Sequence, residues 1–115
     1  MSARRQRQMC IRDSLRAANV PSDTPIGTTE DGAEFSRVIL NDELQLNIEL
    51  ARMDNINAAL KMKTDYPELG AIILECTNMS PYAEAIQEAV ELPVFSIVNL
   101  VEWLHAGLKP KRFSS

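Results

Sequence analysis

Residues 71–81, AIILECTNMSP, decide how this sequence is expected to fold. The first four residues of the stretch are apolar, which is typical of a strand buried on both faces in a parallel sheet. Polar residues follow at once, and the pair Ser80-Pro81 favours the start of a helix. Open α/β sheets bind their ligands at the carboxyl ends of their strands, so we expect Cys76 to lie at a ligand site.

Helical and strand-like segments alternate on both sides of this stretch. Leu46, Leu50, Met53 and Leu60 recur at helical spacing within residues 43–63, which predicts an amphipathic helix with these side chains on its apolar face, and a shorter helix is expected over 33–40. Further along, the pattern predicts a helix over 81–91, a strand over 92–96 and a helix over 97–108 with an apolar stripe that faces the core. This order favours an α/β fold, a three-layer parallel sheet with flanking helices and right-handed crossovers.

Length and composition allow one small domain. The chain has 115 residues, of which 45% are hydrophobic and 24% charged, as in globular proteins. No apolar run approaches the roughly 20 residues that cross a bilayer, so we expect no membrane partner. Residues 1–14 carry four arginines and one aspartate, and the rest of the chain is strongly acidic. An acidic folded part argues against nucleic acid as a partner.

Residues 1–14 differ from the rest of the chain. They are rich in arginine, and they contain neither a helical apolar face nor the apolar core of a signal peptide. The string 8–14, QMCIRDS, resembles translated sequencing-adapter read-through at the ends of gene fragments from environmental DNA. We therefore interpret 1–14 as a disordered or artefactual tail and 15–115 as a partial α/β domain, with the natural N-terminal part missing.

The two cysteines lie in very different surroundings. Cys10 is in the charged tail, whereas Cys76 ends an apolar strand, so a disulfide between them is not expected. Free thiols are typical of a reduced, cytoplasmic protein. With one histidine, His105, and one cysteine in the folded part, we expect no metal site.

Residues 75–82, ECTNMSPY, resemble the aspartate/glutamate/hydantoin racemase superfamily in the part that follows an apolar strand and opens a helix. The resemblance extends from about residue 20 to residue 113 and concerns the C-terminal half of such proteins. It implies one half of a pseudo-symmetric two-domain fold, whose halves face each other across a crevice. It also implies racemisation without a cofactor, in which one thiolate removes the α-proton of a small carboxylate and an opposite thiol returns a proton to the other face.

The resemblance assigns a role to each polar residue after the strand. Cys76 matches the catalytic cysteine of the second half, and Thr77 and Asn78 would bind the substrate carboxylate. Glu75 would orient the thiol or act as a base, although a solvated carboxylate at a strand end is an equal alternative. The cysteine of the first half has no counterpart, because Cys10 lies among arginines with no strand before it. The sequence therefore predicts a racemase or epimerase fragment of the aspartate/glutamate type that is inactive alone.

Two other functions fit the same residues. A decarboxylase of the arylmalonate type uses a single cysteine to protonate a planar carbanion, which explains one thiol. A non-enzymatic carboxylate-binding module would use Cys76 only as a small buried residue, with Thr77 and Asn78 capping the next helix. In every case, we expect apolar surface on a half-protein to favour a homo-oligomer, with Trp103 as a candidate contact.

Overall fold

A computed structural model of the chain describes residues 11–30, 32, 34–40 and 47–114. Residues 11–17 are helical. The elements that follow are helix α2 (Phe35–Leu40), helix α3 (Ile48–Asp65), strand β1 (Ile72–Ile73), the 3₁₀ helix η1 (Thr77–Tyr82), helix α4 (Ala83–Val90), strand β2 (Val94–Phe95) and helix α5 (Ile97–Leu108). None of the described helices is both long enough and apolar enough to cross a bilayer.

The predicted three-layer parallel sheet is wrong, and with it the half of a two-domain racemase-like fold. Within the described residues the sheet has two strands of two residues each, and most of the chain is helical. The pairing is parallel, with Ile72 opposite Val94 and Ile73 opposite Phe95. The predicted order of helices and strands from residue 48 onward is therefore confirmed, but the strands form a much smaller sheet than expected.

Local chemistry explains why the sheet stops so early. The amide of Ile72 donates to the carbonyl of Pro93, and the amide of Leu74 donates to the carbonyl of Phe95. Proline has no N–H, so it gives the ladder an acceptor but no donor. Beyond Leu74 the chain turns, because the amide of Met79 donates to the carbonyl of Cys76 and opens η1. No strand is found before α3 in the described residues, so nothing extends the sheet on that side.

The core lies between α3, α4 and one face of the sheet. Ile72 and Leu74 point into it from the strand region, and Ile86 and Val90 from α4 are almost fully buried. Burying each such side chain stabilises the fold by roughly 1.5–3 kcal/mol. The rings of Phe35 and Tyr82, both in the core, meet edge to face with 5.9 Å between their centroids.

The buried face of α3 is not the one that its leucines predict. The large side chains at positions 50, 53 and 60 are exposed. Small and polar residues are buried instead, namely Ala51, Asp54, Asn55 and Ala59. The two alanines belong to the core that α3 shares with α4, and residues without a bulky side chain allow the two helices to approach closely.

Asp54 ties α3 to the start of α2. Its Oδ2 accepts hydrogen bonds from the backbone amides of Glu34 at 2.6 Å and Phe35 at 2.8 Å, so it caps a helix from outside that helix. Gly32 makes room for this contact, because a Cβ at that position would lie 2.4 Å from the Asp54 Cγ. The loop before α2 is thus fixed by one buried carboxylate.

The start of α4 differs from the expected one. Ser80 and Pro81 lie inside η1, and Tyr82 is the N-cap of α4. The expected end is confirmed, since Glu91 adopts the left-handed conformation with a φ of 57° and its amide donates to the carbonyl of Gln87.

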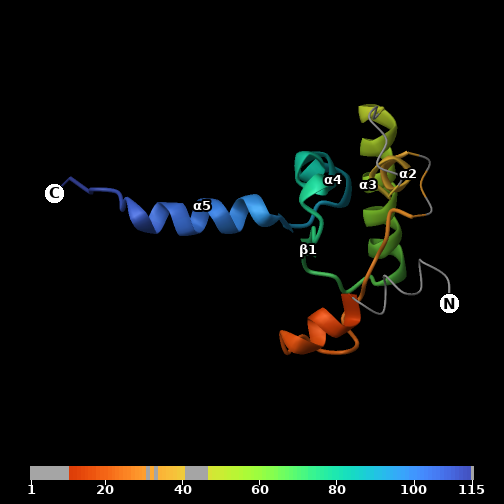
Figure 1. Cartoon of the computed structure of the whole chain (residues 1–115), viewed down its shortest axis with the longest axis horizontal. Helices are drawn as coiled ribbons and strands as arrows, with labels where there is room; N and C mark the ends of the chain where they lie inside the picture. Colours follow the sequence, from red (N-terminus) through yellow and green to blue (C-terminus); the bar gives the residue numbers. More distant parts are fainter. Residues whose placement is uncertain (1–10, 31, 33, 41–46, 115) are drawn as a thin grey trace.

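Helix α5 projects away from the rest of the molecule (Figure 1). Its start is well defined, because the hydroxyl of Ser96 accepts from the amide of Val98, and the Asn99 side chain accepts from the amide of Ser96. The predicted core-facing stripe is wrong: no residue of α5 is buried, and Trp103 is 72% exposed. The outer face of the sheet is open as well, with Ile73 78% exposed.

Candidate functional site

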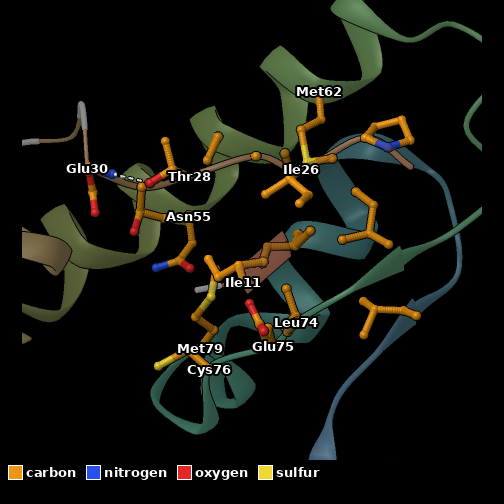
Figure 2. A pocket seen from close by; sticks show the side chains of 18 of the residues that line it. Ile11, Ile26, Thr28, Glu30, Asn55, Met62, Leu74, Glu75, Cys76 and Met79 are labelled. Carbon is orange, nitrogen blue, oxygen red and sulfur yellow. Dashed lines mark hydrogen bonds between the residues drawn. The ribbon is translucent and has the colours of Figure 1, made fainter. Parts of the chain in front are cut away.

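A cavity of about 480 Å³ lies beside the sheet, between α3, the residues around β1 and residues 11–30 (Figure 2). Most of the residues that line it are apolar, among them Ile11, Ile26, Met62 and Leu74. Such a mainly apolar hollow with a few polar groups is the usual form of a small-molecule site.

The N-terminal helical segment closes one side of the cavity. Arg12 donates from Nη1 to the carbonyl oxygens of Ser22 at 3.0 Å and Thr24 at 3.1 Å, which fastens residues 11–17 to the loop after them. Ile11 then reaches the cavity wall. The proposed tail over 1–14 lies mainly outside the described residues, as does Cys10, and its last four residues are helical.

Cys76 lies where the strand region ends and η1 begins, as the sequence predicts. Its side chain is half-buried, it is not in a disulfide, and it lines the cavity. Figure 2 shows it beside Met79 at the edge of the cavity. The thiol is therefore open to a molecule in the cavity while apolar neighbours cover part of it.

The other predicted site residues divide into two groups. Glu75 lines the same cavity as Cys76, and in Figure 2 its carboxylate points toward Ile11. Thr77 and Asn78 are exposed on η1 and do not line the cavity. The structure thus brings the thiol and Glu75 together, and leaves the two expected carboxylate ligands outside.

Asn55 is a site residue that the sequence reasoning missed. It is 1% exposed, and its Nδ2 donates to the carbonyl of Ala51 one turn earlier at 2.9 Å. Its Oδ1 is buried and has no hydrogen-bond partner among the described residues, although Asn55 lines the cavity. A signal was present, since Asn55 lies four residues from both Ala51 and Ala59 and so shares their face of α3.

The charges around the cavity are negative. Glu30 and Glu75 line it, and no lysine, arginine or histidine does so in the part of the chain that the structure describes. Three of the hydroxyls that line the cavity take part in hydrogen bonds: Thr29 and Ser36 share one of 2.7 Å, and Thr28 accepts from the amide of Glu30 at 3.1 Å. The interior therefore offers no cation to a bound carboxylate.

The described residues also contain no group of three acidic, cysteine or histidine side chains that could hold a metal ion.

Burial raises the pKa of the Tyr82 hydroxyl above its ordinary value of 10.0, so this core residue stays a neutral phenol.

Comparison with known proteins gives one partial likeness. Over 41 residues the chain is 40% identical to Dimethylsulfoniopropionate lyase 5 from Emiliania huxleyi (strain CCMP1516). The matched segment is 36% of this chain and only 8% of the length of that lyase. No family model and no solved structure matches the chain. The resemblance to the racemase superfamily therefore stays a prediction.

Proposed function

We propose that Cys76 exchanges a proton with a carbon atom of a small carboxylate, and that this chain is a fragment of a cofactor-independent racemase or epimerase of the aspartate/glutamate type. The observation that carries the proposal is the position of the thiol, half-buried at the edge of a cavity where the strand region ends. Only the thiolate can accept a proton from carbon, and an enclosed site limits competition from water.

The surroundings of Cys76 suggest how a substrate would lie. The cavity interior offers no cation among its described lining residues, so the substrate carboxylate would stay near the exposed Thr77 and Asn78. The carbon next to the carboxylate would then meet the thiol, while the part of the substrate that carries no negative charge enters the apolar cavity. Glu75 would accept a proton from the thiol or orient it.

A single thiolate limits what this chain can do. A base returns a proton to the face from which it took it, so inversion needs a second acid–base group on the opposite face. The sequence has one other cysteine, Cys10, in the arginine-rich tail. We therefore expect exchange of the α-proton with retained configuration rather than racemisation.

Elimination is a second candidate, favoured by the segment shared with a dimethylsulfoniopropionate lyase. A sulfonium group at the β-carbon of a propionate can leave once a proton beside the carboxylate is removed. The first step is thus the same as in racemisation, and a cysteine base would serve either reaction.

Proton exchange in deuterated water tests the proposal. The chain is incubated with L-aspartate, L-glutamate or dimethylsulfoniopropionate, and the α-proton signals are followed by NMR. We expect loss of an α-proton signal in the wild type and in the matched control Cys10→Ser, and no loss in Cys76→Ser. Retained configuration is checked by chiral chromatography of the recovered amino acid.

The other outcomes separate the alternatives. Release of dimethyl sulfide would assign elimination, and release of carbon dioxide from phenylmalonate would assign a decarboxylase. If no probe exchanges, or if Cys76→Ser exchanges as fast as the wild type, the proposal is rejected in favour of a binding module. Because the thiol must stay reduced, the proposal includes a cytoplasmic location.

A further inference from the structure

The Oδ1 atom of Asn55 is a buried acceptor at the cavity wall. The residue is 1% exposed, and no donor among the described residues reaches this oxygen. A buried acceptor without a partner costs about as much as a broken hydrogen bond, so native proteins seldom keep one without a reason.

The orientation of the carboxamide is fixed by its other end. A carbonyl can only accept, so the group facing the carbonyl of Ala51 at 2.9 Å must be the amide nitrogen. The oxygen is then the atom left for the cavity. Figure 2 shows the Asn55 carboxamide leaving α3 toward Ile11, on the side to which the Glu75 carboxylate also points.

The cavity decides which donor can approach. Its described lining is mainly apolar, it holds the carboxylates of Glu30 and Glu75, and it holds no cationic side chain. An anionic group would lie near like charges with no counterion, whereas a hydroxyl or an ammonium would not.

We propose that Asn55 Oδ1 accepts a hydrogen bond from the hydroxyl or ammonium group of a small ligand whose apolar body fills the cavity, while any carboxylate of that ligand stays outside it. Asn55 is then a specificity residue that distinguishes ligands with a hydrogen-bond donor from ligands of the same shape that lack one. This goes beyond the proposed function, because it holds for any occupant of the cavity, whether or not Cys76 transfers a proton.

Four probes of one size test the proposal: benzyl alcohol, benzylammonium, toluene and benzoate. Their Kd values are measured with the full chain by titration of amide chemical shifts. A net hydrogen bond to an otherwise unsatisfied acceptor predicts that benzyl alcohol binds about three- to tenfold more tightly than toluene. Benzylammonium should bind at least as tightly as benzyl alcohol, and benzoate should be the weakest probe.

Asn55→Leu removes the acceptor while it keeps the branched shape of the side chain, and it should erase the preference of benzyl alcohol over toluene. Asn57→Leu is the matched control, since Asn57 is exposed on the same helix, and it should keep the wild-type preference. Within the wild type, the side-chain amide signals of Asn55 should shift with benzyl alcohol and not with toluene, which tests the contact even if Asn55→Leu fails to fold.

Several results would overturn the inference: equal Kd values for benzyl alcohol and toluene, a preference that survives in Asn55→Leu, or no binding of any probe. None of these depends on turnover. If Cys76→Ser retains the donor preference while proton exchange is absent from the wild type, the proposed function fails and the Asn55 site stands.

Discussion

Removal of the Asp54 carboxylate should destabilise the fold more than removal of any other carboxylate on α3. The residue is 7% exposed, and its Oδ2 accepts from two buried amides at 2.6 and 2.8 Å. Hydrogen bonds to a charged acceptor contribute about 1.5–3 kcal/mol each, and loss of a helix cap alone costs about 0.5–2 kcal/mol. The cap consists of these same hydrogen bonds, so the two contributions are not added together. We expect Asp54→Ala to lower the free energy of unfolding by about 3 kcal/mol.

The neighbouring structure should not compensate for this loss. Glu34 and Phe35 are themselves buried, so water reaches their amides poorly once the carboxylate is gone. Asp54→Asn keeps an oxygen in place but removes its charge, and about half of the destabilisation is expected. Both variants should loosen α2 before the rest of the fold.

Urea unfolding followed by circular dichroism measures these differences. The matched control is Asp65→Ala on the same helix, where an exposed carboxylate pairs with Lys61 and a change within about 0.5 kcal/mol is expected. A loss below 1 kcal/mol in Asp54→Ala, or a loss equal to that of the control, would refute the capping role.

Two further predictions concern Tyr82 and α5. Because burial raises the pKa of the Tyr82 hydroxyl above 10.0, the folded chain keeps this proton where the unfolded chain loses it. Stability should therefore be insensitive to Tyr82 below about pH 10 and fall above it, and Tyr82→Phe should make that fall shallower in unfolding curves taken across this range. Trp103→Glu should leave the free energy of unfolding within about 0.5 kcal/mol, since its side chain is outside the core, yet weaken self-association through α5. Sedimentation at increasing concentration checks this, and a wild type that stays monomeric throughout would contradict it.

The order of elements after residue 47 could be predicted because its signals are local. A proline and polar residues mark the end of α3, and Ser96 with Asn99 marks the start of α5. Such caps act within one turn, so the sequence carries them directly. The number of strands in the sheet depends on contacts between distant segments. An apolar run such as 71–74 has the same sequence pattern whether one strand or two strands lie beside it.

The face of α3 shows the same limit within one helix. The leucines and methionine at helical spacing predicted the buried side, but α4 packs where α3 presents Ala51 and Ala59. The spacing of apolar residues predicts a helix with distinct faces. Which face is buried depends on where a neighbouring element packs closely against it. Asn55 was missed for this reason, whereas Cys76 and Glu75 were found from their position after the strand.

Helix α5 has a consequence for how mutations combine in this chain. Substitutions around the cavity share neighbours in α3, α4 and the strand region, so their effects should depend on one another. No residue of α5 is buried, and changes along this helix should add independently to changes in the core. A selection for folding would therefore leave α5 free to drift, and any constraint found on Trp103 would report an interaction made outside this fold.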